Sequence, residues 1–213
     1  MEQRTIKDWV IREKMPEGFG SFRVLLLLHG WTGDENSMEI FTKGMPGNYW
    51  LAAPRGIYAS APGGYSWYSD QEKTWPWMDD FRPAMEALVE LLTPEVFPGA
   101  ELEQIDVMGF SQGAALAYAL AFLTPQRVRN IIGLAGFMPE GGEALARNKP
   151  LSGKRIFVAH GSLDKLVPVE KGRTCVSVLK SAGGEVTYCE DEVGHKLSKG
   201  CSAELRRFFN TGV

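Results

Sequence analysis

The feature that most constrains this chain is the pentapeptide Gly109–Gly113, which has the sequence GFSQG. The residues before it, 105–108, have the apolar pattern of a short buried strand, and residues 114–121 have the pattern of a buried helix. A serine with a glycine two residues away on each side of it, at such a corner, lies in a turn too tight for side chains at the glycine positions. The turn strains the serine backbone and exposes its hydroxyl group. The segment therefore predicts a strand–turn–helix unit that presents Ser111 as a nucleophile.

Composition restricts the class of protein. The 213 residues suffice for one domain with a sizeable core, which we expect to span residues 1–213. The 23 basic and 26 acidic residues give a net charge of −3, so we expect no nucleic acid and no anionic membrane to be bound through charge. The longest apolar run, 24–28, is far too short to span a bilayer, and residues 1–8 lack the apolar core of a signal peptide.

The cysteines and histidines give no sign of a metal site. Cys175, Cys189 and Cys201 are odd in number and lack the spacing of metal ligands, and no two histidines have ligand-type spacing. We expect buried or half-buried thiols in a reducing, cytoplasmic compartment, although the sequence is also compatible with a disulfide between two of the cysteines. No metal or other cofactor is expected.

Strand-like and helix-like segments alternate along the chain. The expected strands are 23–28, 49–53, 105–108, 130–136, 155–160 and 185–189, and the expected helices are 79–92, 114–123, 169–182 and 199–209. Residues 5–13 are expected to add an antiparallel edge strand. This alternation predicts an α/β fold with an open, mostly parallel sheet and helices on both faces.

A nucleophilic serine needs a base beside it, and the base must be oriented by a carboxylate. In an open parallel sheet these groups come from loops at the carboxyl ends of strands, in the chain order serine, acid, histidine. Of the three histidines, His29 precedes the turn, and His160 lies before any acid that could follow it in that order. We therefore expect both to be structural. His195 follows the last predicted strand and is the candidate base.

The candidate acid is Asp164, because it follows directly on the predicted strand 155–160. Glu170 lies at a predicted helix start, and the acidic run 190–192 follows the last strand. These alternatives would leave Asp164, at its strand end, without a role.

Acyl transfer also needs two backbone N–H donors for the oxygen that becomes negative. The amide of Gln112, at the start of a helix, is one candidate. The amide of Trp31, in the loop after the first core strand, is the other. Arg55, in the turn 54–56, is a candidate for holding a neighbouring loop.

Aromatic residues are concentrated at 65–68 and 75–78. They either cover the core or line an apolar pocket for the acyl group. We take Trp67, Tyr68 and Val167 as candidate substrate-pocket residues.

Four segments together resemble the phospholipase/carboxylesterase family of α/β-hydrolases: LHG at 28–30, GFSQG at 109–113, HGSLDKLVP at 160–168 and GH at 194–195. The resemblance extends over about residues 24–209. It implies a single-domain esterase with no lid domain, with Ser111, Asp164 and His195 as the catalytic triad and Trp31 and Gln112 at the oxyanion positions. Trp31 departs from the family pattern, in which a small or aliphatic residue commonly follows His-Gly, and it would reshape the site.

The resemblance and the ordered triad lead us to expect a cytoplasmic serine carboxylesterase. It would hydrolyse small to medium acyl esters through an acyl-enzyme intermediate, as a monomer or a homodimer. Acyl-thioesterase or lysophospholipase activity is a close alternative. A non-catalytic scaffold that binds a ligand or a partner is an alternative of another class, and the intact set of Ser111, Asp164 and His195 argues against it.

Overall fold

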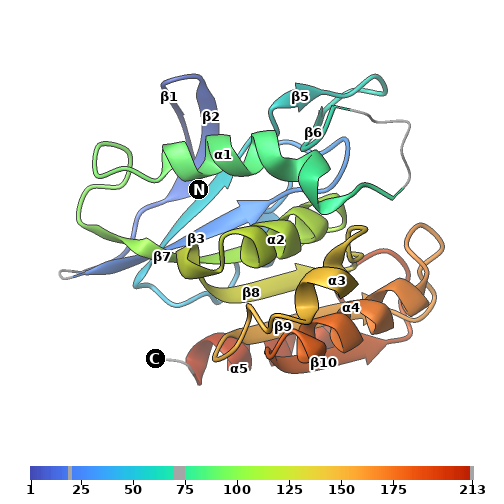
Figure 1. Cartoon of the computed structure of the whole chain (residues 1–213). Helices are drawn as coiled ribbons and strands as arrows, with labels where there is room; N and C mark the ends of the chain where they lie inside the picture. The colour runs from blue at the N-terminus through green and yellow to red at the C-terminus, as the bar shows by residue number, and fades with distance from the viewer. Residues whose placement is uncertain (19–20, 70–74, 212–213) are drawn as a thin grey trace.

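Eight strands form one sheet in the order β1-β2-β4-β3-β7-β8-β9-β10 (Figure 1). The computed structural model describes residues 1–18, 21–69 and 75–211. The strands are β1 Glu2–Ile6, β2 Trp9–Lys14, β3 Phe22–Leu28, β4 Tyr49–Pro54, β7 Ala100–Phe110, β8 Val128–Leu134, β9 Arg155–Gly161 and β10 Glu185–Asp191. Among the described residues of this sheet, the β1–β2 and β2–β4 pairs are antiparallel and the other neighbouring strands pair in parallel. The predicted mostly parallel sheet is confirmed.

Helices cover both faces of this sheet. They are α1 Arg82–Leu91, α2 Gln112–Leu123, α3 Gly142–Ala146, α4 Val169–Ser181 and α5 Lys199–Asn210. Alternate residues of β3 belong to different clusters, because successive side chains on a strand point to opposite faces. Leu26 and Leu28 pack with residues of α1, α2 and α4, whereas Leu25 and Leu27 pack with residues of α5. The α/β-hydrolase type of architecture expected from the sequence is therefore present.

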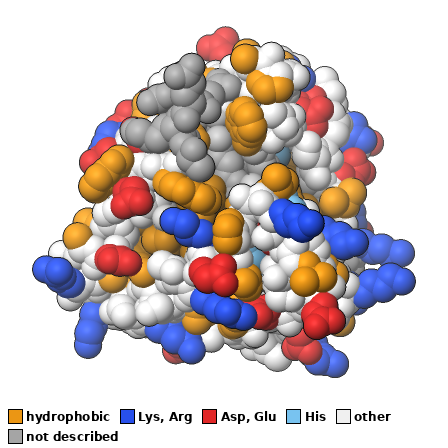
Figure 2. All heavy atoms as spheres, turned by 90° about the vertical axis from the view of Figure 1, so that its right-hand side faces the viewer, with side chains coloured by type: hydrophobic (Ala, Val, Ile, Leu, Met, Phe, Trp, Pro, Cys, Tyr) orange, Lys and Arg blue, Asp and Glu red, His pale blue; other side chains and the backbone are white. Residues whose placement is uncertain are grey.

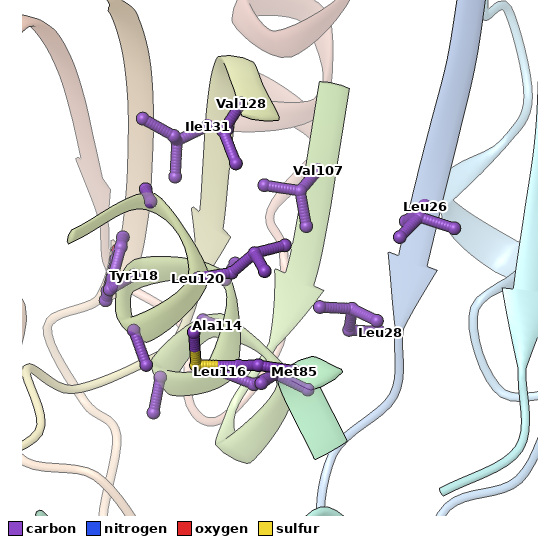
Figure 3. Close-up of a cluster of buried hydrophobic side chains, with 14 of the residues drawn as sticks. Leu26, Leu28, Met85, Val107, Ala114, Leu116, Tyr118, Leu120, Val128 and Ile131 are labelled. Atoms are coloured by element: carbon purple, nitrogen blue, oxygen red, sulfur yellow. The ribbon is translucent and has the colours of Figure 1, made fainter. Parts of the chain in front are cut away.

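The helix after Ser111 is buried on all sides. Residues 112–122 of α2 are buried, and the many alanines among them allow the helix to approach the sheet closely. Leu116 and Leu120 lie among side chains from β3, β7 and β8, with Met85 of α1 covering them (Figure 3). Burial of each such leucine stabilises the fold by about 1.5–3 kcal/mol. The start of α2, and with it Ser111, is thus anchored in the core.

Several local features differ from the sequence-based expectations. Residues 5–13 belong to a hairpin of two strands, β1 and β2, because the chain turns at Lys7 with a positive φ of 53°. A 3-10 turn, η2 Met78–Phe81, precedes α1, which begins only at Arg82. The short pair β5 Tyr58–Ala59 and β6 Tyr65–Ser66, helix α3 and the 3-10 turns η1 Glu39–Phe41 and η3 Pro125–Arg127 were not predicted.

The cysteine expectation is wrong for two of the three residues. Cys189 of β10 and Cys201 of α5 form a disulfide, with their Cα atoms 5.6 Å apart. Helix α5 packs on the sheet face that carries Cys189, and this tertiary contact is not visible in the sequence spacing. Cys175 is a buried free thiol, as expected. None of the helices in the described part of the chain combines the length and apolar character needed to cross a membrane.

Candidate active site

The strand–turn–helix unit around Ser111 is as tight as its glycines suggest. Ser111 has φ 54° and ψ −116°, a backbone conformation that a residue with a side chain rarely adopts. A Cβ atom on Gly109 would lie 2.0 Å from the carbonyl oxygen of Gly113, and one on Gly113 would lie 2.0 Å from that of Leu28. Within the described residues the Ser111 hydroxyl has no hydrogen-bond partner. The hydroxyl is therefore free to meet a ligand.

Asp164 and His195 come together at the carboxyl edge of the sheet. His195 Nδ1 donates to Asp164 Oδ2 over 2.6 Å. The other carboxylate oxygen accepts the amides of Leu166 and Val167, at 2.9 and 3.0 Å. The Asp164 side chain is fully buried, whereas that of His195 is 16% exposed. Hydrogen bonds thus fix the carboxylate, and the carboxylate fixes the imidazole.

The His195 loop is held against the strand that leads to Asp164. A Cβ on Gly161, the last residue of β9, would lie 2.2 Å from the carbonyl oxygen of Val193, so the two backbones are in direct contact. The ring of Phe110, the residue before Ser111, lies 4.9 Å from that of His195. Ser111, Asp164 and His195 therefore lie around one edge of the sheet. Figure 2 shows this face, with small areas of histidine surface between hydrophobic side chains.

The alternative acids are placed differently. Glu190 accepts two hydrogen bonds from Arg173 and one from Tyr188. His195 has no contact with Glu170 or with the acidic run 190–192 among the hydrogen bonds and ion pairs of the described residues. Asp164 is thus the carboxylate that orients His195.

The two candidate oxyanion donors lie beside the serine. A Cβ on Gly30 would lie 3.2 Å from Ser111 Cβ, so the loop that carries Trp31 contacts the turn directly. Neither the Trp31 amide nor the Gln112 amide donates a hydrogen bond to another described residue. Both amides therefore remain available to an oxygen bound near Ser111. The Trp31 side chain is 48% exposed.

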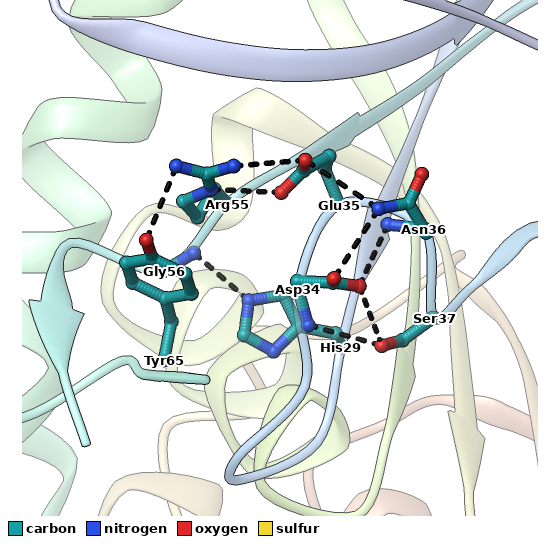
Figure 4. Close-up of polar contacts among 8 residues, drawn as sticks. All are labelled: His29, Asp34, Glu35, Asn36, Ser37, Arg55, Gly56 and Tyr65. Carbon is teal, nitrogen blue, oxygen red and sulfur yellow. Dashed lines mark hydrogen bonds and ion pairs between the residues drawn. The ribbon is translucent and has the colours of Figure 1, made fainter. Parts of the chain in front are cut away.

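A polar network holds the Trp31 loop (Figure 4). Arg55 donates two hydrogen bonds to Glu35, at 2.8 and 2.9 Å, and a third to Tyr65 Oη. His29 Nε2 accepts the Gly56 amide over 2.8 Å, so its Nδ1 carries the proton and donates to the Gly30 carbonyl oxygen. Burial lowers the pKa of His29, which keeps the imidazole neutral. Arg55 thus holds the neighbouring loop as predicted.

Trp67 lies behind the site. Its side chain has no exposed surface, and its Nε1 donates to the His29 carbonyl oxygen over 2.8 Å. Its amide donates to Gln112 Oε1 over 2.9 Å. The indole of Trp67 therefore fills the core under the Trp31 loop, and its candidate role in the substrate pocket stays a prediction. Tyr68 and Val167 are also almost completely buried, and their pocket role stays a prediction. Residues 70–74 of the aromatic segment lie outside the described residues.

Sequence reasoning missed the burial of Glu35, whereas it expected a structural role for His160. Glu35 is 2% exposed, and a lone acidic residue in a loop gives no sign of such burial. His160 is buried, with Nε2 at 2.8 Å from the Val167 carbonyl oxygen and 3.6 Å from Asp164 Oδ2, so it supports the Asp164 loop. Across the described residues, no three His, Cys, Asp or Glu side chains are placed to hold a metal ion.

A serine at a strained strand-to-helix turn, with a carboxylate–histidine pair at the same edge of a mostly parallel sheet, defines an α/β-hydrolase type of site. Residues 20–211 match the family model described as phospholipase/carboxylesterase, and the chain belongs to that family.

Relatives agree with this assignment. The chain is 34% identical over 95 residues to acyl-protein thioesterase 1 of Saccharomyces cerevisiae, which covers 44% of this chain and 42% of the relative. It is 32% identical over 118 residues to a probable carboxylesterase of Oryza sativa subsp. japonica, with 54% and 44% covered. The chain thus matches less than half the length of these two relatives. The crystal structure of the Bacillus cereus carboxylesterase has the same fold, with a TM-score of 0.80, 21% identity and coverage of 95% and 94%.

The disulfide closes the loop that contains His195, because Cys189 and Cys201 are 12 residues apart and lie on either side of it. Replacing Cys201 with serine is expected to lower the free energy of unfolding by about 3 kcal/mol, since the unfolded chain regains the freedom of that loop. Urea denaturation with and without a reductant checks this. Cys175→Ser, which changes a free thiol, is the control whose reductant response should equal that of the wild type. Equal stability of oxidised and reduced wild type would contradict the prediction.

Proposed function

We propose that the chain is a serine hydrolase that cleaves carboxylic esters through an acyl-enzyme on Ser111. The hydrogen bond between Asp164 and His195, beside a serine whose hydroxyl is free, is the observation that carries this proposal. The buried carboxylate of Asp164 keeps the proton of the His195 imidazole on Nδ1, so Nε2 is free to act as a base. Membership of the phospholipase/carboxylesterase family supports the same reaction class.

The reaction would follow two steps. As Ser111 Oγ bonds to the ester carbonyl carbon, His195 Nε2 accepts the hydroxyl proton, and the oxygen that becomes negative faces the amides of Trp31 and Gln112. The bond to the alcohol oxygen then breaks, and that oxygen takes the proton from Nε2. Water attacks the acyl-enzyme in the same way, which releases the carboxylic acid and restores Ser111.

The same site would accept a thioester, because a thiolate leaves more readily than an alkoxide. The printed name of the yeast relative, acyl-protein thioesterase 1, favours this second candidate. A comparison of acetyl and octanoyl oxyesters with the matching thioesters separates the two activities and gives the preferred acyl length. We keep small to medium acyl esters as the expected substrates.

Labelling of Ser111 tests the proposal. A fluorophosphonate should add one phosphonyl group to the wild-type protein, and peptide mass spectrometry should place it on Ser111. Ser111→Ala should stay unlabelled. Ser162→Ala, which removes a hydroxyl that donates to the Asp191 carbonyl oxygen, should label like the wild type. The wild type and Ser162→Ala should hydrolyse short-chain p-nitrophenyl esters before labelling, and labelling should abolish this activity. A wild type that binds esters without turnover, as tightly as Ser111→Ala does, would instead support the non-catalytic scaffold.

The compartment and the oligomeric state stay predictions. The cytoplasmic location inferred from the sequence conflicts with the usual setting of a disulfide, which persists in oxidising compartments. Acid quenching of intact cells, followed by alkylation under denaturing conditions without a reductant and by mass analysis, decides between them. Three alkylated cysteines would favour the reducing compartment, and alkylation of Cys175 alone the oxidising one.

A further inference from the structure

A pocket of about 320 Å³ opens next to His195, between the Trp31 loop and the segment 195–197. Its inner wall is Phe110, the residue before Ser111, and its outer wall is formed by Ile40 and Phe41 of η1. It therefore adjoins the groups that would perform the chemistry. None of the candidate substrate-pocket residues Trp67, Tyr68 and Val167 lines this pocket.

Ring systems dominate the walls. The rings of Phe41 and Phe110 stack at 5.5 Å with an angle of 28° between them, and Phe110 in turn lies 4.9 Å from His195. Trp31 and Ile40 stand at the mouth with 48% and 77% of their surfaces exposed. Aromatic faces and edges of this kind bind flat apolar groups more strongly than the burial of apolar surface area alone would predict.

The polar groups of the pocket give little to a ligand. Ser37 Oγ donates to Asp34 Oδ1 and accepts the Asp34 amide, so its hydrogen bonds are already made. Lys196 is the charged residue among the described residues that line the pocket. Its positive charge disfavours a cationic ligand, since the Asp34 carboxylate behind Ser37 does not itself line the pocket.

The position of His195 identifies the part of the ester that lies here. His195 must protonate the oxygen of the departing alcohol, so that oxygen lies within hydrogen-bond reach of Nε2. A pocket walled by His195 and Phe110, on the α5 face of the sheet, then continues from the alcohol side of the ester bond. We propose that this pocket binds the alcohol part of the substrate and selects uncharged alcohols that carry a ring. The inference rests on the proposed serine-hydrolase function.

The pocket volume is large enough for an alcohol that carries one aromatic ring or two fused rings. A buried cavity of about 150 Å³ holds benzene, so a pocket about twice that size accepts a benzyl or naphthylmethyl group. A simple ethyl group would leave most of the aromatic wall in water.

Acetate esters of different alcohols test the inference. With the acyl group fixed, kcat/KM should rise about tenfold from ethyl to benzyl acetate and should fall for the choline ester. Phe41→Ala should remove the preference for benzyl over ethyl acetate. Ile40→Ala, at an exposed position that contributes little to folding, should reduce it about threefold. Met15→Ala, an exposed apolar change near the opposite edge of the sheet, should leave the benzyl-to-ethyl ratio unchanged.

A second readout excludes a general loss of activity. Every acetate ester forms the same acetyl-enzyme, from which the alcohol has already gone, so hydrolysis of that intermediate should be equal in wild type and Ile40→Ala. A benzyl-to-ethyl ratio near one in an active wild type, or a ratio unchanged in both variants, would overturn the alcohol-pocket assignment and leave the hydrolase proposal standing. Failure to hydrolyse any ester of either the acetyl or the octanoyl series would overturn the hydrolase proposal itself.

Discussion

Asp164→Asn is expected to hydrolyse esters about four orders of magnitude more slowly than the wild type, although its fold stays intact. The cause is the hydrogen-bond pattern around this side chain. One carboxylate oxygen accepts two amides, from Leu166 and Val167, so the asparagine carbonyl oxygen must take that place. The asparagine NH2 group then faces His195 Nδ1. Because it can only donate, the imidazole must carry its proton on Nε2 and can no longer accept one from Ser111.

The measurement is kcat for p-nitrophenyl acetate, with thermal unfolding to confirm the fold. Glu192→Gln is the matched control, because it removes an exposed carboxylate three residues from His195 and should change kcat less than twofold. Equal losses in the two variants would show that local negative charge, and not the orientation of His195 by Asp164, supports the reaction.

Gly113→Ala is expected to lower the free energy of unfolding by about 3 kcal/mol or more and to abolish hydrolysis. Its methyl group would lie 2.0 Å from the Leu28 carbonyl oxygen and 2.6 Å from that of His29. Both atoms belong to backbone, so neither can rotate away as a side chain could. Helix α2 would have to move from the end of β3, and Ser111 would move with it.

Urea denaturation and the yield of folded protein measure this effect. Gly194→Ala is the control beside His195, because the atom nearest to its new methyl group is the Leu163 carbonyl oxygen at 3.9 Å. That variant should lose less than about 1 kcal/mol. Equal stability of Gly113→Ala and wild type would mean that the turn is looser than its backbone contacts indicate.

Much of the fold could be predicted because its strongest signals are local. The strands β3, β8 and β9 each contain an apolar run, as is typical of buried parallel strands. The turn at Ser111 follows from two glycines that a tight corner requires. The position of Asp164 follows from the end of β9. Each of these inferences uses residues close together in the chain.

The features that were missed depend on contacts between distant residues. Cys189 and Cys201 pair only because α5 packs on β10, and Glu35 is buried only because Arg55, 20 residues away, neutralises it. For Trp67, the sequence alone leaves two positions in the fold open. A tryptophan in a loop fits either a pocket wall or a buried support, and the sequence does not show the hydrogen bond from Trp67 to the His29 carbonyl oxygen.

The arrangement of β9, α4, β10 and α5 has a consequence for how the chain acquires its chemistry during folding. Residues 155–210 are contiguous and contain Asp164, His195 and both cysteines of the disulfide, so the acid–base pair can form within one segment of low contact order. Ser111 and both oxyanion loops belong to the preceding part of the chain. The two parts meet where β8 pairs with β9. Recovery of hydrolysis during refolding should therefore be a late event that reports the docking of these two parts, and not the formation of either one.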